Sequence, residues 1–294
     1  MKALYICSTT TFSGKTSLCV GLGNRFKSDG FSVGYMKPVS TVARRIAGRI
    51  VDEDAQFIKQ ALDLAEPLEV IAPIALMPQV VEDILAGEEK ADFAARLRKA
   101  HAEVARGKDL VLLEGGAHCM EGAFIGLSTP MVAEMLDARE LVVVKYTSDL
   151  VVDDLLGSKA LFGASMLGAV INSVPRQRMR FVEEVARPYL EEHGVKVFAV
   201  LPQDRLLMSI SVGQLVDCLG GQVLCCPEAC DELVEHLMVG AMTVDSALTY
   251  FRRKPNKAVI TGGDRPDIQL AALETSTKCL ILTGNLYPSP IILD

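Results

Sequence analysis

The sequence contains no tryptophan, and aromatic residues account for only 5% of its 294 residues. A large core must therefore be built mainly from Val, Leu, Ile, Ala and Met, which is typical of a buried parallel sheet. The sequence also lacks any apolar run close to the roughly 20 residues that span a bilayer. Its first residues lead into a strand without the basic and apolar segments of a secretion signal. We therefore expect a cytoplasmic protein with no membrane partner.

The sequence also has fewer basic than acidic residues: it contains 30 Lys and Arg and 37 Asp and Glu residues, and its net charge is −7. A nucleic-acid-binding surface needs a dense basic stripe, so this composition argues against a nucleic-acid partner. The eight cysteines fit free thiols in a reducing compartment. Four of them cluster in the sequence without the spacing of paired C-x₂-C metal ligands, namely Cys218, Cys225, Cys226 and Cys230. We interpret these four cysteines as small buried hydrophobic residues, and metal binding is the alternative.

The stretch from residue 3 to residue 18 has the pattern of a strand, a tight loop and a helix start. The apolar run Ala3–Cys7 is followed by Ser8-Thr9-Thr10-Thr11-Phe12-Ser13-Gly14-Lys15-Thr16. In a phosphate-binding P-loop, backbone N–H groups and the helix N-terminus form a cradle of positive charge. The lysine then reaches the terminal phosphates, and the threonine hydroxyl ligates Mg²⁺. One departure is that the first glycine of G-x-x-x-x-G-K-[ST] falls on Thr9, and an ordinary strand-to-helix turn is the alternative for this motif alone.

Polar residues follow further expected strands. Lys37 precedes Pro38, which forces it out of helical geometry at the end of a strand over 31–36. Glu114 ends the apolar strand 109–114 and is followed by two glycines, as a Walker-B-like element requires. Asp54 lies in the first turn of a helix running to about residue 64, where it either complements the helix dipole or faces a metal. The carboxyl edge of an open α/β sheet is where ligands bind, so these side chains are expected to gather there.

Strands and helices alternate along the rest of the chain. Strands at 141–145, 168–172 and 196–201 are separated by helices at 152–164 and 178–192, while residues 66–88, with three prolines, predict a long irregular excursion. This alternation predicts a doubly wound, mostly parallel α/β sheet over residues 1–204. A smaller α/β unit is expected over residues 205–294. Its predicted elements are a helix at 211–219, a strand at 222–226, helices at 228–237 and 243–253, a strand at 257–261, a helix to about 274, a strand at 278–283 and a final strand at 291–294.

Five spaced motifs, Lys15-Thr16, Lys37-Pro38-Val39, Asp54-Ala55, Glu114-Gly115 and Asn172, make the first 204 residues resemble dethiobiotin synthetase and its relatives. These relatives include the cobyrinic acid a,c-diamide synthases. The resemblance implies a P-loop fold that binds ATP and Mg²⁺, with the metal held by Thr16, Asp54 and Glu114. It also implies that Lys15 and Lys37 contact phosphates or a reacting carboxylate and that Asn172 reads adenine. The implied nucleotide contacts are Thr11, Ser13, Gly14, Lys15, Thr16, Ser17 and Asn172. Ser8 stands where the synthetase loop has glycine, and the residues after Val39 depart from the synthetase pattern.

Residues from about 206 to 294 resemble a DRTGG domain, through Val239-Gly240-Ala241-Met242 and Ile260-Thr261-Gly262-Gly263-Asp264-Arg265. A dethiobiotin-synthetase-like domain followed by a DRTGG domain is similar to the N-terminal regulatory half of long bacterial phosphotransacetylases. We expect this second unit to be cut short at its C-terminus.

Two functions fit these residues. The favoured one is a Mg-ATP-binding protein of regulatory or nucleotide-sensing type that signals to a partner enzyme. The alternative is an ATP-dependent ligase that activates a small carboxylate or carbamate by phosphoryl transfer, using Lys15, Lys37 and Mg²⁺ for positioning and charge neutralisation. By analogy with relatives of this class, a homodimer is expected.

Overall fold

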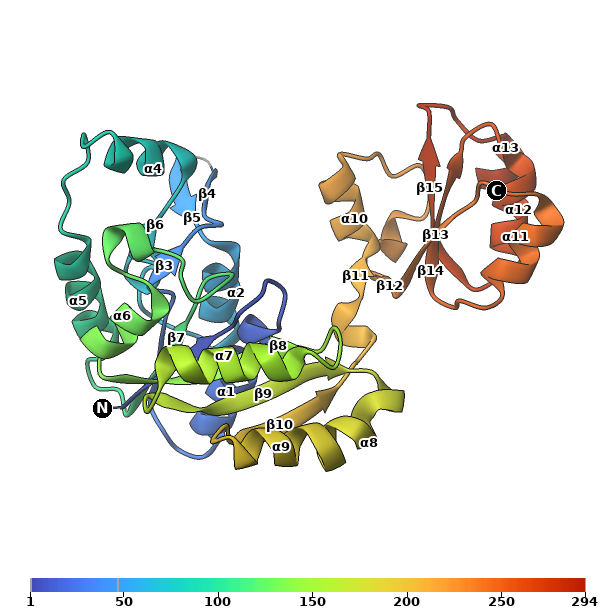
Figure 1. Ribbon diagram of the computed structural model, residues 1–294. Helices are drawn as coiled ribbons and strands as arrows, with labels where there is room; N and C mark the ends of the chain where they lie inside the picture. The colour runs from blue at the N-terminus through green and yellow to red at the C-terminus, as the bar shows by residue number, and fades with distance from the viewer. Residues whose placement is uncertain (1, 47, 294) are drawn as a thin grey trace. The chain divides into compact units, whose positions relative to one another are not determined.

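The computed structural model describes residues 2–46 and 48–293. The chain forms two compact units, one ending at Gln203 and the other beginning at Asp204 (Figure 1). Within the described residues, no helix has both the length and the hydrophobicity needed to cross a membrane.

The first unit is built on a sheet of six strands in the order β10-β9-β8-β1-β7-β2. Every neighbouring pair in this sheet is parallel. The strands are β1 (Lys2–Cys7), β2 (Val33–Met36), β7 (Leu110–Glu114), β8 (Ala138–Lys145), β9 (Met166–Val174) and β10 (Val197–Pro202). The order of strands reverses at β1, which lies between β7 and β8. The expected doubly wound parallel sheet is therefore confirmed, and the end of β1 is its switch point.

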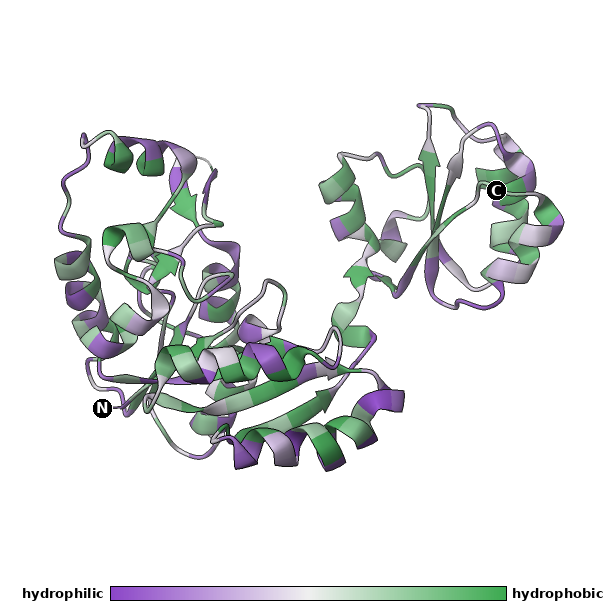
Figure 2. Ribbon diagram, in the orientation of Figure 1, coloured by the Kyte–Doolittle hydropathy of each residue, from purple (hydrophilic) through white to green (hydrophobic). Residues whose placement is uncertain are grey.

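Both faces of this sheet are covered by helices. Helices α1 (Lys15–Ser28) and α2 (Glu53–Ala61) pack on the face that carries Ile6, whereas α5 (Phe93–Val104) and α6 (Thr129–Met135) pack on the face that carries Tyr5. The half formed by β8, β9 and β10 packs against α7 (Val151–Phe162) and α9 (Arg187–Glu192). Figure 2 shows mainly hydrophobic strands beneath helices that alternate between hydrophobic and hydrophilic residues. Burial on both faces explains why these strands read as nearly continuous apolar runs.

The connection between α2 and α5 is more ordered than the sequence predicts. The expected irregular excursion over 66–88 is wrong, because the chain forms α3 (Leu68–Ile71), β6 (Ile74–Ala75) and α4 (Pro78–Leu85). Two of its prolines start helices instead of breaking them, with Pro67 at the N-cap of α3 and Pro78 in the first turn of α4. The remaining elements of the first unit are β3 (Val39–Ser40), β4 (Arg44–Ile46), β5 (Arg49–Val51), η1 (Ala123–Ile125), η2 (Arg176–Arg178), α8 (Met179–Phe181) and the π-helical η3 (Val182–Ala186).

The second unit is a small α/β layer structure. Its three-stranded parallel sheet has the order β13-β14-β15, with β13 (His236–Val239) at one edge, β14 (Lys257–Gly262) in the centre and β15 (Thr277–Thr283) beyond it. Helices α11 (Val244–Phe251) and α12 (Pro266–Leu273) bury Val259 against one face. Helix α10 (Val212–Leu219), which opens with a capping box, packs near Ala258 on the other face. A short antiparallel pair is formed by β11 (Ile210–Ser211) and β12 (Leu233–Val234).

Three predicted elements of this unit are wrong. The strand expected at 222–226 is absent, and Cys226 adopts a left-handed φ of 50° before the turn η5 (Pro227–Asp231). The helix expected at 228–237 is replaced by this turn, β12 and the start of β13. The strand expected at 291–294 is instead the short helix α13 (Pro290–Leu293), whose leading proline suits a first helical turn. Residue 294 itself lies outside the described residues.

All eight cysteines are free thiols. Cys7, Cys19 and Cys119 of the first unit are buried. Cys218, Cys225 and Cys226 of the second unit are exposed, so their interpretation as small buried hydrophobic residues is wrong. For Cys225 and Cys226 the cause is the missing strand at 222–226, whereas Cys218 lies on the exposed side of α10. Among the described residues, no three His, Cys, Asp or Glu side chains gather closely enough to hold a metal ion by themselves.

Candidate nucleotide-binding site

The loop between β1 and α1 lies at the carboxyl edge of the sheet, at its switch point. The Ser8 hydroxyl donates to the Thr10 carbonyl (2.9 Å) and accepts from the Thr10 N–H (3.1 Å), so this serine shapes the loop where a glycine is usual. Gly14 precedes α1 with a φ of +93°, a left-handed conformation that favours glycine. A Cβ atom at Gly14 would lie 2.3 Å from Nδ2 of Asn172. The loop therefore keeps the second glycine of the motif for a steric and a conformational reason.

Several polar groups of the loop lack partners. The hydroxyl oxygens Oγ1 of Thr9 and Oγ of Ser13 are buried without a hydrogen bond. The ammonium of Lys15, a buried residue, forms no hydrogen bond or ion pair with any of the described residues. Burial lowers the pKa of Lys15, although the carboxylate of Glu114 opposes this shift. Buried polar atoms are normally paired, so this concentration of unpaired groups fits a loop shaped to receive phosphate oxygens.

Asn172 holds this loop from β9. Its Nδ2 donates to the carbonyl of Ser13 at 2.8 Å, and its Oδ1 accepts from the N–H of Ser173. Sequence reasoning places Asn172 near the nucleotide, and the structure brings it against the P-loop backbone. Its two amide atoms are both occupied by the chain, so in this structure Asn172 positions the loop.

Glu114 lies at the end of β7, next to β1, and its side chain is buried. Its Oε1 accepts from the Thr16 hydroxyl at 2.6 Å, and its Oε2 accepts from the Tyr35 hydroxyl at 2.7 Å. Burial raises the pKa of Glu114 above its ordinary value, and the charge of Lys37 and these two hydrogen bonds oppose the shift. The structure thus joins Thr16 and Glu114, two of the three residues expected to hold a metal.

The third of these residues, Asp54, reaches the site through Lys37. The Lys37 ammonium lies 2.7 Å from Oδ2 of Asp54 and 2.9 Å from Oδ2 of Asp52, and the Lys37 side chain is only 4% exposed. Burial alone would lower the pKa of Lys37, but the carboxylates of Asp52, Glu114 and Asp54 outweigh it and raise the pKa. Lys37 is therefore a charged, fully paired cation.

Sequence reasoning missed three side chains of this network, namely Tyr35, Ser40 and Asp52. Asp52 caps α2 by accepting from the N–H of Ala55 at 2.8 Å, and it also accepts from the Ser40 hydroxyl. An aspartate directly before an acidic first turn is an N-cap signal that could have identified Asp52. Tyr35 stands inside an apolar strand, and no local signal marks its hydroxyl as part of the site.

Two predicted contacts lie at the rim. Thr11 and Ser17 are exposed, and neither side chain forms a hydrogen bond with the described residues. Phe12, between Thr11 and Ser13, has a positive φ of 51° and a side chain that is 90% exposed. The outer part of the loop thus presents an apolar ring to solvent.

The donor set fits Mg²⁺, which prefers oxygen ligands and usually keeps waters and phosphate oxygens in its shell. The Thr16 and Glu114 oxygens are 2.6 Å apart, close to the roughly 2.9 Å that separates adjacent oxygens around octahedral Mg²⁺. Thr16 and Glu114 could hold the ion directly, with Asp54 beside them.

A parallel sheet with a P-loop at its switch point and an acidic residue at the end of the neighbouring strand defines a P-loop NTPase fold. The chain belongs to the AAA_26 family, described as "AAA domain", whose model matches residues 2–211. The model of the DRTGG domain matches residues 214–294. The resemblance inferred from the sequence is confirmed.

The relatives are of two kinds. Phosphate acetyltransferase of Synechocystis is 24% identical in a match that covers 99% of this chain and 43% of that protein. The ATP-dependent dethiobiotin synthetase BioD of Pseudomonas aeruginosa is 28% identical in a match that covers 63% of this chain and 83% of that enzyme. BioD of Caldicellulosiruptor saccharolyticus is 28% identical over 39% of this chain and 48% of that enzyme. The chain spans less than half the length of the phosphate acetyltransferase that it matches.

Proposed function

We propose that the first unit binds Mg·ATP and acts as a nucleotide sensor, with the ligand state of the P-loop read by a partner enzyme or by another part of a longer polypeptide. Similarity to phosphate acetyltransferase over nearly the whole chain supports a regulatory role. Similarity to ATP-dependent dethiobiotin synthetase supports ATP as the nucleotide.

The observation that carries this proposal is the contrast between the two lysines of the site. Lys15 is unpaired and is available to the terminal phosphates of a nucleotide. Lys37, which a ligase would use for its substrate carboxylate, is already neutralised by Asp52 and Asp54 in a buried position. A substrate anion would have to compete with Asp54, whose side chain is 46% exposed, for a cation that also stays paired with the buried Asp52. Binding without productive transfer is therefore favoured over the ligase alternative.

Each residue of the site would have a distinct role when Mg·ATP is bound. The N–H groups of the loop and the Lys15 ammonium would hold phosphate oxygens, with Gly14 permitting their close approach. Thr16, Glu114 and Asp54 would hold Mg²⁺, which would neutralise charge on the phosphates. Asn172 would keep the loop in place through its bond to Ser13.

The test is calorimetric titration of Mg·ATP into the full chain, with phosphate release followed in parallel. Lys15→Ala should weaken binding at least about tenfold, because it removes a charged contact to phosphate. Lys99→Ala is the matched control, since it removes the same charge from an exposed site on α5. Tight binding supports the site, and negligible phosphate release fits either the sensor or a ligase that awaits its substrate. Absence of binding to the unmodified chain, or equal binding by both variants, would overturn the assignment of the site.

The homodimer and the cytoplasmic location remain proposals. Sedimentation with and without Mg·ATP tests the first, and a monomer at high concentration in both conditions would reject it.

A further inference from the structure

The second unit carries a groove along the free edge of its sheet. The groove has a volume of about 650 Å³ and lies between β13 and helix α11 together with the residues just beyond it. Among the described residues, β13 pairs only with β14, so its other edge is open. Its lining residues are Glu235, His236, Leu237, Met238, Val239, Met242, Tyr250 and Lys254. Pockets of about 300 to 1,000 Å³ suit small organic ligands.

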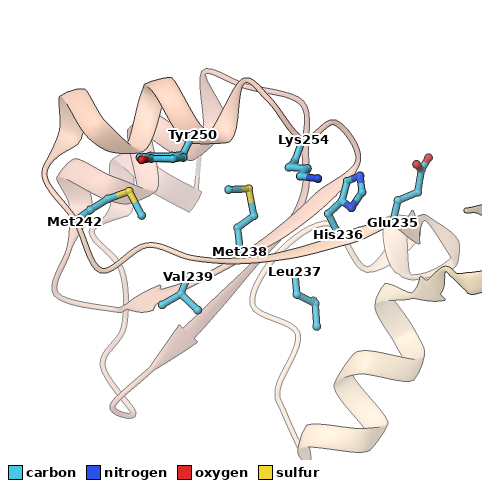
Figure 3. A pocket seen from close by; sticks show the side chains of 8 residues that line it. All are labelled: Glu235, His236, Leu237, Met238, Val239, Met242, Tyr250 and Lys254. Atoms are coloured by element: carbon cyan, nitrogen blue, oxygen red, sulfur yellow. The ribbon is translucent and has the colours of Figure 1, made fainter. Parts of the chain in front are cut away.

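One end of the groove is apolar. Figure 3 shows Met238 on the side of β13 that faces α11, with Tyr250 and Met242 along the same wall. Methionine side chains are flexible and adapt to flat or irregular ligands. The guanidinium of Arg253 lies 4.8 Å from the centroid of the Tyr250 ring. This wall therefore offers an aromatic ring and two thioethers to an apolar group.

The other end of the groove is basic, in a protein whose net charge is −7. Figure 3 shows Lys254 beside His236. The Nε2 atom of His236 is buried without a hydrogen bond. Burial and the positive charges of Lys254 and Arg205 lower the pKa of His236, while Glu235 opposes them.

The charges around this end are unevenly paired. The Glu235 carboxylate accepts from Nδ2 of Asn256 at 2.7 Å, so part of its charge is already satisfied. Lys254 and Arg205 form no side-chain hydrogen bond or ion pair with the described residues. Lys254 and His236 thus line one end of a groove whose other end is apolar, and the charge of Arg205 also acts on His236.

We propose that this groove is a binding site for a small organic anion that carries a flat or acyl apolar group. The apolar group lies against Met238, Met242 and Tyr250, and the negative group lies between Lys254 and His236. An inorganic anion alone would leave the apolar wall uncovered, and a neutral apolar molecule would leave the cations unpaired. The site belongs to the second unit and does not depend on nucleotide binding by the first.

Two fluorescent probes test this site on the full chain. 1-Anilinonaphthalene-8-sulfonate carries a negative group on an aromatic body, and N-phenyl-1-naphthylamine has the same body without the charge. Lys254→Gln should weaken sulfonate binding by about threefold and leave the neutral probe unchanged. Met242→Ala should weaken both probes. Arg252→Gln is the matched control, because it removes the same charge two residues away outside the groove.

Protonation of His236 supplies a second readout. Sulfonate affinity should rise as the pH falls through the lowered pKa of His236, because the protonated imidazole adds positive charge to the site. His236→Gln should remove this rise. Thermal unfolding of each variant checks that the second unit remains folded. Equal sulfonate affinity in the Lys254→Gln and Arg252→Gln variants, or no effect of Met242→Ala on either probe, would overturn the proposal.

Discussion

Tyr35 donates its hydroxyl to Oε2 of Glu114 at 2.7 Å, on the side of the carboxylate opposite to its hydrogen bond with Thr16. Both oxygens of this buried acid are thus fixed by neighbours on two other elements, β2 and α1. A carboxylate held in this way needs little reorganisation to become a metal ligand. This arrangement requires both the Tyr35 hydroxyl and the Glu114 carboxylate.

Tyr35→Phe should destabilise the first unit by about 2 kcal/mol, because a buried carboxylate loses a hydrogen bond. It should also raise the pKa of Glu114 further, since this bond favours the charged form. Urea unfolding, with hydrogen exchange of β7 peptides to report on this unit, measures the first effect. Tyr189→Phe, which alters an exposed ring, is the control and should be neutral. Equal stability of the two variants would contradict the structural role of Tyr35.

Lys37→Met should cost the first unit about 3 to 5 kcal/mol, because Asp52 would be left buried without its cation. Adding Asp52→Asn should recover much of this loss, since the unpaired charge is then removed. A double-mutant cycle measured by urea unfolding gives the coupling energy. The comparison variant is Lys108→Met, which breaks a 3.3 Å ion pair with Glu66 nearer the surface and should cost about 1 kcal/mol or less. Additive effects of the Lys37 and Asp52 substitutions would show that the pair is not coupled.

Glu114 should leave a signature in the pH dependence of stability. Its pKa in the folded protein is raised above the ordinary value of 4.5, so the folded state holds this proton more tightly than the unfolded state. The free energy of unfolding should therefore fall as the pH rises from 4.5 through the raised pKa. Subtracting the profile of Glu114→Gln from that of the unmodified chain isolates this contribution. An identical slope in both profiles would rule it out. Mg²⁺ prefers the carboxylate form, so its affinity should rise with pH over the same range.

Gly14→Ala should destabilise the first unit by about 1 to 3 kcal/mol, because the residue has a positive φ and its Cβ would meet Asn172. Adding Asn172→Ala should relieve the collision but not the backbone strain, so recovery is partial. Gly21→Ala is a suitable control, since its Cβ would meet nothing within 4 Å in the middle of α1. That change should be neutral or stabilising by about 1 kcal/mol. A Gly14→Ala protein as stable as Gly21→Ala would refute the steric argument.

The parallel sheet of the first unit was predictable because its strands are buried on both faces, which gives runs such as Leu110–Leu113 a clear sequence signal. The gathering of the motif residues at one edge was equally predictable, because the carboxyl ends of parallel strands meet there in any doubly wound sheet. The hydrogen bonds of the site could not be predicted from the sequence. The bond from Tyr35 to Glu114 joins two strands 79 residues apart, and nothing near Tyr35 in the sequence requires it.

The second unit was harder to predict because its elements are short and its sheet is small. β13 has four residues and an exposed edge, so Leu237 and Val239 are exposed and the strand lacks the continuous burial that marks β1. The run from Glu228 to Leu237 therefore reads as an amphipathic helix. Residues 236–239 form a strand instead, because they pair with Lys257–Ile260. A local sequence pattern does not reveal this tertiary contact.

The uneven burial of the eight thiols gives the protein a built-in handle for spectroscopy. Cys218, Cys225 and Cys226 are open to solvent, whereas Cys7, Cys19 and Cys119 are enclosed in the first unit. A maleimide dye added to the native chain will attach to the second unit and spare the first. The rate at which the three buried thiols react later then measures how fast the P-loop unit opens. The two units can thus be followed separately in one molecule without engineering either of them.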